Sequence, residues 1–497
     1  MKKTKSKRLR LLCLALCGAT LALSLTACAK KTPTAPTDTD ETVQTEEYND
    51  GLPAQMDYDR TASVLSWKSA DSKSGTDWSD GISSDTVNDA VFKSRNQVAK
   101  RLNISFDIHT ADGDWNNRAP FMMNVKNAAE NGTPYDLVGQ YSTTGVQLAV
   151  EGVYTDLTRY SALDFSDAWW PGKVTESLTI GKSLYFCTGD ITPTCVTMIG
   201  SVFVNLDLAK SYGIQEDFYG IVRRGEWTLK RMQEIFLDKV GTTADESSRV
   251  YGIQIAHGGV FDNLFFSGGL RFVSHDEDGY LTVDKCITNQ ITTNWFDTCR
   301  AFVFGNEDVT KYGSSETIGT MFMQDRSIAY ISHVLSDASQ YLKEANFDYA
   351  VLPYPKRDEV QSDYYSQAAL GVTMFAIPEA ATNKSFSAVL LQALGSDAYR
   401  TMTPEIYNSY FRTRFMATPE NAEMLDLIHD SLVWDIGRIA GDTIGTSAGG
   451  NEQAKPLSMF NCWRQAFYNQ TVSWSAILAG SLGNWQSSLE SMNESLG

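Results

Sequence analysis

The sequence lacks several features that would assign a class at once. After residue 27 it contains no apolar run near the ~20 residues that cross a bilayer. The cysteines form no C-x-x-C pair and the histidines no H-x-x-x-H pair, so neither a structural zinc site nor a catalytic metal site is predicted. No internal repeat of solenoid period is present, which excludes a stacked-repeat architecture.

Basic residues are also scarce. The chain has 42 Lys and Arg against 60 Asp and Glu, a net charge of −18. Six of the basic residues lie before residue 11, so the chain beyond residue 27 carries −24. This balance argues against nucleic acid or another polyanion as a partner. With 497 residues, 42% of them hydrophobic, the chain is long enough for two or three folded domains.

The first 57 residues read as a leader and a tether. A basic segment is followed by an uncharged, mostly apolar run over 11–27, which is typical of a secretory signal peptide at 1–27. Leu25-Thr26-Ala27-Cys28 resembles a bacterial lipoprotein box, which implies cleavage before Cys28 and a lipid on its sulfur. Residues 28–57, rich in Thr, Pro, Asp and Glu, predict a disordered tether. The alternative is an uncleaved N-terminal anchor; in both cases the rest faces the extracellular side of the cell membrane.

The rest of the chain alternates strand and helix patterns. Alternating or continuous apolar runs predict strands, and amphipathic stretches predict helices between them. The predicted strands are 63–67, 103–108, 135–138, 201–204, 252–255, 327–331, 349–353 and 371–378. The predicted helices include 85–102, capped by Ser84 or Asp85, then 117–130, one that begins at Thr228, 384–394, and most of the tail after Pro404. The fold class is therefore α/β, with helices on the faces of largely parallel sheets.

A series of short motifs, in this order and spacing, resembles family 1 of the extracellular solute-binding proteins, the sugar-binding lipoproteins of ABC importers. The motifs are Asn88-Asp89-Ala90-Val91 with Arg95-Asn96, Gly132-Thr133-Pro134-Tyr135-Asp136-Leu137-Val138, Gly152-Val153-Tyr154-Thr155-Asp156-Leu157, Trp169-Trp170, Thr188-Gly189-Asp190, Gly225-Glu226-Trp227-Thr228 and Leu352-Pro353-Tyr354-Pro355-Lys356. The resemblance implies a two-lobed, type II periplasmic-binding fold with the ligand between the lobes. Carried onto this chain, the lobes would hold 58–190 with 366–402, and 191–362 with 403–497. The crossings would lie near Asp190, 362–368 and 401–404.

Candidate ligand-binding residues follow from where ligands bind in such sheets, beyond the carboxyl ends of the strands and between domains. Strand ends nominate Trp67, Gln140, Tyr141, His257 and His333. The first crossing nominates Asp190, and the resemblance adds Trp434, Asp435, Trp463 and Arg464 in the helical tail. Aromatic rings can cover a sugar face, while carboxylates, amides and Arg suit its hydroxyls. Each aromatic or histidine here has an equally ordinary alternative as a core residue.

Cys187 and Cys195 flank the first predicted crossing and predict a possible disulfide, with two free thiols as the alternative. Gly445-Thr446-Ser447-Ala448-Gly449 matches a nucleophile elbow but has loop-like flanks, so it does not predict a hydrolase. The sequence thus predicts a monomeric, lipid-anchored protein that captures a carbohydrate, an oligosaccharide in particular, for an ABC permease. It would have no cofactor, no metal and no catalytic activity. The alternatives are a surface glycoside hydrolase and a peptide- or metal-capturing lipoprotein.

Overall fold

The computed structural model describes most of the chain from residue 49 to residue 497. The residues outside the description are 1–48, 70–76, 80, 83–84, 238–239, 241–244, 246–247, 257, 307–309, 414, 417, 441–442, 446–457 and 470. The predicted signal, Cys28, most of the tether and His257 therefore lie outside the described residues. Among the helices that are described, none combines the length and the apolar character needed to span a bilayer.

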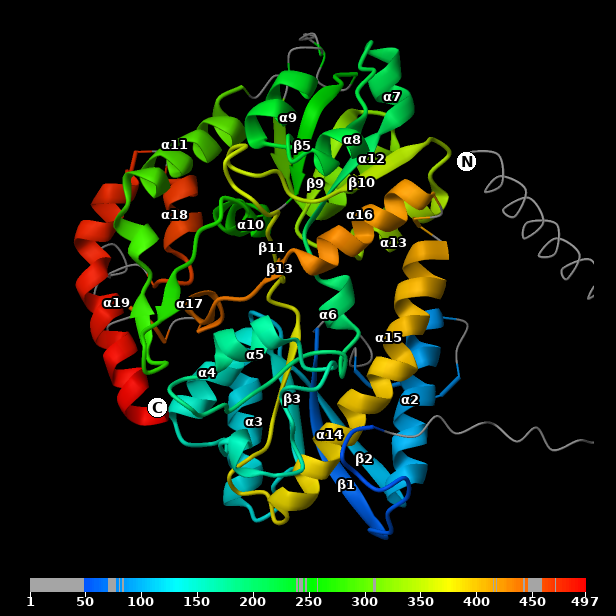
Figure 1. The fold of residues 1–497 in the computed structure, drawn as a ribbon, viewed down its shortest axis with the longest axis vertical. Coiled ribbons are helices and arrows are strands. Elements are labelled where there is room, and N and C mark those ends of the chain that lie inside the picture. The colour runs from blue at the N-terminus through cyan, green and yellow to red at the C-terminus, as the bar shows by residue number, and fades with distance from the viewer. Residues whose placement is uncertain are drawn as a thin grey trace, which may run out of the picture. The chain divides into compact units, whose positions relative to one another are not determined.

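The first of two main sheets has four strands in the order β12-β3-β1-β2. Strands β1, β2 and β3 are parallel, and β12 pairs antiparallel with β3. The strands are β1 (Arg60–Lys68), β2 (Ile104–Asp112), β3 (Leu137–Tyr141) and β12 (Thr373–Ala376). The part of the molecule built on this sheet, drawn below the crossing segments in Figure 1, is called the first lobe.

Helices of the first lobe connect and cover these strands. They are α2 (Thr86–Leu102), α3 (Arg118–Glu130), α4 (Ser142–Val150), η1 (Leu157–Arg159), α5 (Gly172–Leu178) and α14 (Lys384–Arg400). Helix α2 begins where predicted, because the Asp85 carboxylate accepts a hydrogen bond of 2.9 Å from the Asn88 amide. Helix α14, which arrives late in the chain, packs beside α2.

The second sheet has five strands in the order β10-β4-β9-β5-β8. Strand β5 is parallel to β8 and β9, whereas β4 is antiparallel to both β9 and β10. The strands are β4 (Ser201–Asn205), β5 (Tyr251–Ala256), β8 (Thr310–Gly313), β9 (Ser327–Ser332) and β10 (Tyr349–Leu352). The part built on this sheet is called the second lobe. The mixed α/β fold class predicted from the sequence is confirmed.

The second lobe holds most of the remaining elements. Before β10 these are α7 (Leu206–Ser211), α8 (Phe218–Arg223), α9 (Leu229–Phe236), α10 (Gly259–Ser267), the hairpin β6 (Val273–His275) and β7 (Leu281–Val283), η2 (Lys285–Thr288), α11 (Gln290–Phe304), α12 (Ser315–Met323), α13 (Asp337–Tyr341) and η3 (Leu342–Glu344). The tail contributes the π-helical η4 (Glu405–Arg412), α16 (Pro419–Asp430), α17 (Ile436–Ile439), α18 (Cys462–Tyr468) and α19 (Trp474–Leu496). Figure 1 shows α19 running along one flank, where it also contacts α4 of the first lobe.

Three chain segments cross between the lobes. The first contains α6 (Thr194–Thr197), the second contains β11 (Ser366–Gln367), and the third contains α15 (Met402–Pro404). The first two lie side by side, because the Ala369 amide donates 2.7 Å to the Met198 carbonyl. Strand β11 also pairs in parallel with β13 (Leu432–Val433) of the tail. A hinge made of a few adjacent segments is thus built into the connectivity.

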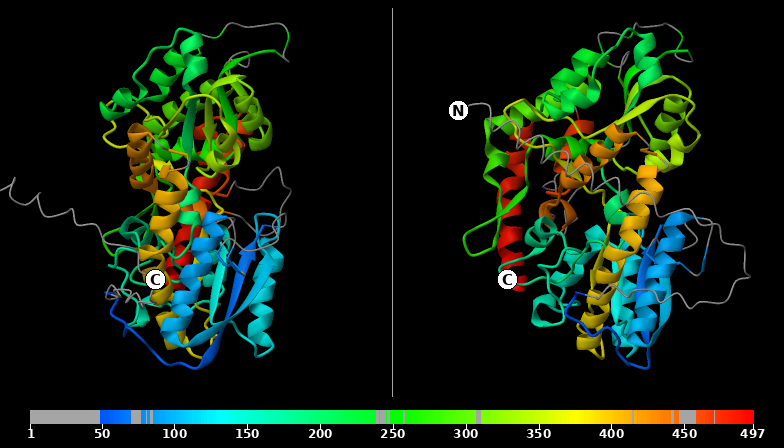
Figure 2. Two further views of the ribbon diagram at one scale, coloured as in Figure 1. Left: turned by 90° about the vertical axis from the view of Figure 1, so that its right-hand side faces the viewer. Right: turned by 45° about the vertical axis from the view of Figure 1, so that its right-hand side comes forward.

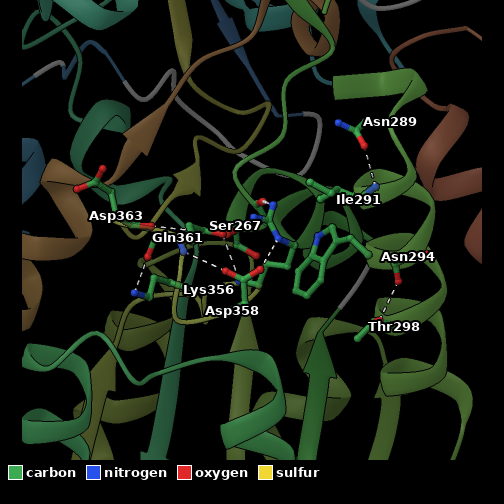
Figure 3. A network of polar contacts seen from close by, with 12 residues as sticks. Ser267, Asn289, Ile291, Asn294, Thr298, Lys356, Asp358, Gln361 and Asp363 are labelled. Carbon is green, nitrogen blue, oxygen red and sulfur yellow. Dashed lines mark hydrogen bonds and ion pairs between the residues drawn. The ribbon is translucent and has the colours of Figure 1, made fainter. Parts of the chain in front are cut away.

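The loop that leads into β11 is fixed by Gln361, which is buried. The side-chain NH2 of Gln361 donates hydrogen bonds of 2.8 Å to the backbone carbonyls of Ser267 and Asp363. The backbone carbonyl of Gln361 accepts a hydrogen bond of 2.7 Å from the Lys356 ammonium (Figure 3). The backbone N–H of Gln361 donates a hydrogen bond of 2.9 Å to the Asp358 carboxylate. Ser267 is the last residue of α10, so this network ties the second crossing to the helix that carries part of the site.

Candidate functional site

A cavity of about 530 Å³ opens between the lobes, within the ~300–1,000 Å³ that is usual for small-molecule sites. The first lobe, the second lobe and the crossing segments all contribute to it. Its lining residues are Trp115, Asn116, Tyr141, Met198, Gly259, Asp262, Asn263, His333, Val334, 367–371, Arg438 and Arg464. Tyr141 ends β3, and His333 follows β9, so the cavity lies beyond the carboxyl ends of parallel strands, as ligand sites in such sheets do.

Trp115 is placed by a tight turn after β2. A Cβ atom on Gly113 would meet Trp67 at 2.9 Å and Phe121 at 2.8 Å, so only glycine fits there. The Asp114 carboxylate then accepts 3.1 Å from the Asn116 amide, which fixes the turn. The half-buried Trp115 ring is thereby presented at the edge of the cavity.

Tyr141 is supported from below by Trp67. The two rings pack edge to face with centroids 5.1 Å apart, and the Trp67 indole donates 2.8 Å to Thr373 of β12. Trp67 is 5% exposed and does not line the cavity. Burial raises the pKa of Tyr141 to about 12, so its hydroxyl stays a neutral donor and acceptor at physiological pH.

A column of four side chains joins the lobes beside the cavity. Arg118 lies 3.6 Å over the Trp115 ring, and Trp115 stacks on Phe460 with centroids 4.7 Å apart at 17°. Arg438 in turn lies 4.1 Å over the Phe460 ring. The first two residues belong to the first lobe and the last two to the tail, so the column is a direct contact across the cleft.

Two guanidinium groups share one carboxylate on the opposite wall. Asp262, on α10, accepts 2.5 Å from Nη2 of Arg438 and also pairs with Nη2 of Arg464. Asp262 and Arg438 are almost fully buried, and the Arg464 side chain is 19% exposed. Burial lowers the pKa of Arg438 to about 10, while Asp262 opposes the shift. Burial also disfavours the charged form of Arg464, but the ion pair with Asp262 outweighs it and the pKa is raised.

Asn263, next to Asp262, fixes the position of the second crossing. Its side-chain oxygen accepts 2.8 Å from the amide of Gln367, in β11. A Cβ on Gly259, at the start of α10, would lie 2.9 Å from the His333 ring, so that ring packs directly against the helix start. The second crossing and the His333 ring, which both line the cavity, are therefore held against α10, the helix that carries Asp262. The side of the cavity formed by Asp262, Arg438 and Arg464 is called the charged wall.

The structure brings three of the nominated residues together in the cavity, namely Tyr141, His333 and Arg464. It places four others in the core. Trp434 and Trp463 are 6% and 1% exposed. Gln140 is fully buried and accepts 2.7 Å from the Tyr154 hydroxyl. Trp67 packs beneath Tyr141, as described above. His257 lies outside the described residues.

Asp435 and Asp190 are not among the residues that line the cavity. The Asp435 carboxylate accepts from the amides of Phe272, at 2.6 Å, and Gly437, at 2.8 Å. The Asp190 backbone amide donates 3.1 Å to the Trp169 carbonyl, and burial raises the pKa of the Asp190 carboxyl to about 6. Asp190 precedes α6 in the chain and lies outside the cavity lining.

The possible disulfide between Cys187 and Cys195 is not present; both are buried free thiols. The backbone of Cys187 is bridged to Phe375 of β12, and the Cys195 sulfur lies 3.2 Å from the Thr188 hydroxyl. The Cys195 sulfur therefore has a hydroxyl as its polar neighbour. Burial raises the pKa of Cys195 to about 12 and that of Cys187 further.

Sequence reasoning missed Trp115, Asp262 and Arg438. The second strand was predicted to stop at Ile108, but β2 continues to Asp112, so the residues after its true end were passed over. The signal for Asp262 was present: Asp262-Asn263 is a polar pair inside the apolar segment of α10. Arg438 lies just beyond Trp434-Asp435, the pair that was chosen in its place.

A smaller cavity of about 280 Å³ adjoins the first on the other side of Trp115. It shares Trp115 and Asn116 with the first cavity and is otherwise lined by Arg118, Ala119, Met122, Thr143, Thr144 and Gln147. The two cavities are therefore adjacent, with Trp115 and Asn116 between them. Among the residues that the structure describes, no cluster of three or more His, Cys, Asp or Glu is arranged to hold a metal ion.

No protein-family model and no curated protein sequence matches the chain. Solved structures do. The sugar-binding protein MalE from the phytopathogen Xanthomonas citri has a TM-score of 0.55 at 12% identity, over 87% of this chain and 98% of that one. The galacto-N-biose-/lacto-N-biose I-binding protein of the ABC transporter from Bifidobacterium longum, in complex with lacto-N-biose, scores 0.54 at 11% identity, over 88% and 97%.

An ABC substrate-binding protein of Listeria monocytogenes in complex with cycloalternan scores 0.52 at 12% identity, covering 88% of this chain and 98% of that chain. At such identities the likeness concerns the fold. It extends over nearly the full length of each of these structures and includes both lobes. The chain therefore has the two-lobed α/β fold of the sugar-binding proteins of ABC transporters.

Proposed function

We propose that the protein captures an oligosaccharide outside the cell and delivers it to an ABC permease. The observation that carries the proposal is the cavity between the lobes, with Trp115 and Tyr141 on one wall and Asp262, Arg438 and Arg464 on the other. Aromatic rings suit the C–H face of a pyranose, and charged donors and acceptors suit its hydroxyls. Solved structures with this fold bind lacto-N-biose and cycloalternan.

The presence of two adjacent cavities supports a ligand of more than one sugar ring. Trp115 and Asn116 line both cavities, so a chain of sugars would pass along the indole from one to the other once opening of the lobes has separated Phe460 from the ring. Closure of the lobes would remove water from both walls, and hydrogen bonds strengthen in the lower local dielectric. Rotation about three short crossing segments is sufficient for that movement.

A binding role without chemistry fits the carboxylates of the site. A glycoside hydrolase needs two carboxyl groups about 5–9.5 Å apart across the scissile bond. Within the described lining, Asp262 is the carboxylate present, and it is held between two guanidinium groups. The two-carboxylate arrangement of a glycoside hydrolase is therefore not met by the described lining.

The test of capture is calorimetry of the purified full-length protein against oligosaccharides of two to six units, with peptides and divalent metals as the competing classes. We expect saturable binding of one carbohydrate class, together with a rise in melting temperature. Recovered ligand should be unchanged by mass spectrometry. Cleaved products would identify a hydrolase, and saturation by peptides or metals alone would overturn the proposal.

We further propose that Cys28 anchors the protein to the outer face of the cell membrane. The lipobox-like segment and the acidic, Thr- and Pro-rich residues after it support this. Mass spectrometry of the native protein should find a diacylglyceryl group on Cys28, and Cys28→Ala should release the chain or leave it unprocessed. A native N-terminal peptide that carries Cys28 without lipid would contradict the anchor.

A further inference from the structure

Among the described residues, the charged wall has two guanidinium groups and one carboxylate, an excess of one positive charge. Arg438 and Arg464 both pair with Asp262, and in the described part of the chain neither pairs with another carboxylate. This is a local excess in a chain whose net charge is −18, so it does not reflect the general surface potential. From this wall we infer that the captured carbohydrate is acidic, with its anionic group bound by Arg438 and Arg464.

The hydrogen-bonding state of Arg438 points the same way. A guanidinium has five N–H donors, and the Arg438 side chain is 3% exposed. Its Nε and Nη1 are buried without an acceptor among the described residues, as is Nε of Arg464. Buried donors and buried charges are costly unless they are paired. A bound group that accepts several hydrogen bonds at once would complete this wall.

A neutral hydroxyl would complete it less well than an anion. A hydroxyl accepts hydrogen bonds but leaves the extra charge in place, whereas a carboxylate or phosphate neutralises it and takes two parallel N–H bonds from a guanidinium. Phe460 covers one face of the Arg438 guanidinium, which leaves its edge as the direction for such bonds. Tyr141, across the cavity, lies in the electrostatic field of Arg438, Arg118 and Arg464, with Asp114 opposing them.

The inference rests on the proposed function, since the aromatic wall is what assigns the ligand to the carbohydrates. The shared chemistry of the candidate ligands is one anionic group on a sugar ring. Uronic acids, sugar sulfates and sugar phosphates all supply it, and the experiment separates them.

The first experiment uses the wild-type full-length protein, so no variant has to fold. Calorimetry compares an oligouronide with its carboxyl-reduced neutral counterpart, and sulfated and phosphorylated oligosaccharides with their unmodified forms. We expect the acidic member of one pair to bind on the order of 10- to 150-fold more tightly, the value of a charge-assisted hydrogen bond. The ligand pair that shows this difference in affinity identifies the anionic group.

Two other outcomes are distinguishable. Equal or tighter binding of the neutral members would overturn the acidic-ligand inference and leave oligosaccharide capture intact. Binding of neither member of any pair, in a protein shown to be folded, would overturn both. Raising the salt from 0.05 to 0.5 M should weaken the acidic ligand and leave a neutral one unaffected, because only the former is screened.

The second experiment uses Arg464→Gln, which removes the more exposed guanidinium and leaves the buried pair of Asp262 and Arg438 in place. We expect it to reduce the preference for the acidic ligand about tenfold or more. Arg223→Gln is the matched control, because Arg223, at the end of α8, is an exposed guanidinium that pairs with Glu423 of α16 outside the cavity. An equal loss for acidic and neutral ligands in Arg464→Gln would show that the guanidinium serves hydroxyls, and would overturn the inference.

Discussion

The two walls of the cavity are built on different principles. The wall from the first lobe presents ring surfaces, Trp115 and Tyr141, held by a glycine-dependent turn and by packing on Trp67. The wall from the second lobe and the tail presents charge, with Asp262 between Arg438 and Arg464. Ring surfaces give contact area that depends little on the identity of the sugar, whereas charges distinguish ligands strongly.

The difference implies a division of labour between the lobes. Packing against apolar surface has little directional requirement, so under the proposed function the aromatic wall would accept a sugar while the cleft is still open. The charged wall is effective only when water has left, because bonds to charged groups gain strength in a low dielectric. Each wall can therefore be impaired separately, with different effects on stability, affinity and selectivity.

The largest expected effect comes from Asp262→Ala. Removing the shared carboxylate leaves Arg438 and Arg464 side by side without their partner. Breaking a buried ion pair in this way costs about 3–5 kcal/mol of unfolding free energy. Urea unfolding measures it, with the exposed Asp107→Ala as control. A change below about 0.5 kcal/mol, the level of surface substitutions, would contradict the buried triad.

Trp115→Ala tests the aromatic wall. Losing roughly 100 Å² of ring contact should weaken binding by about 2 kcal/mol, some 30-fold, for acidic and neutral oligosaccharides alike. Calorimetry with a matched ligand pair measures both losses at once. Tyr399→Ala, an exposed ring on α14, is the control. A loss confined to the acidic ligand would mean that the two walls are not separable.

Asp190→Asn should change stability and leave ligand affinity unaltered, because Asp190 belongs to neither wall. Its carboxyl titrates near 3.9 when unfolded and at about 6 when folded. The folded state thus binds the proton more tightly than the unfolded state. The contribution of the protonated carboxyl to the unfolding free energy is therefore fully present below pH ~4 and is lost as the pH rises through ~6.

The variant stays neutral throughout. It should match the wild type at pH 4 and exceed it by about 2 kcal/mol at pH 7, after discounting for partial exposure. Unfolding free energies at the two pH values measure this difference. A variant that is less stable than the wild type at both, or that loses ligand affinity, would return Asp190 to the binding role predicted from the sequence.

Phe460→Ala should give the smallest effect and addresses how the walls communicate. It removes the ring between Trp115 and Arg438, a stacked contact worth about 0.5–1.5 kcal/mol. The ligand-free protein should shift toward an open form, seen as a larger radius of gyration in solution scattering. Unchanged scattering in the variant would show that the column does not hold the lobes together.

The fold was more predictable than the site. Strands such as β1 and β3 carry apolar runs that hardly depend on context, and Asp85 is a helix cap by its own side-chain chemistry. The order of elements followed from these local signals. The ends of elements did not: β2 extends through polar residues to Asp112 because β1 pairs with it along the full length. A four-residue error at that end concealed Trp115.

The choice between core and cavity was the other limit. Trp434, Trp463 and Trp115 are chemically identical, and only tertiary packing decides which ring faces a ligand. Trp463 is enclosed by Phe265, Phe296 and Trp474, residues far apart in the chain. Tyr141 and His333 could be placed near the cavity because a strand end is a position that sequence can locate. Asp262 lies inside a helix and has no such marker, apart from being polar in an apolar segment.

The crossing of the chain between the lobes also sets the order in which the protein can fold. Strand β3 ends at Tyr141, but β12, its antiparallel partner, begins at Thr373. Roughly 230 residues, including the whole second sheet, emerge between them, which takes on the order of 10–50 s at ordinary rates of synthesis. For that interval the edge of β3 has no native neighbour, and an unpaired strand edge is a template for aggregation. A chain interrupted anywhere before residue 373 would keep that edge open permanently, however complete its second lobe.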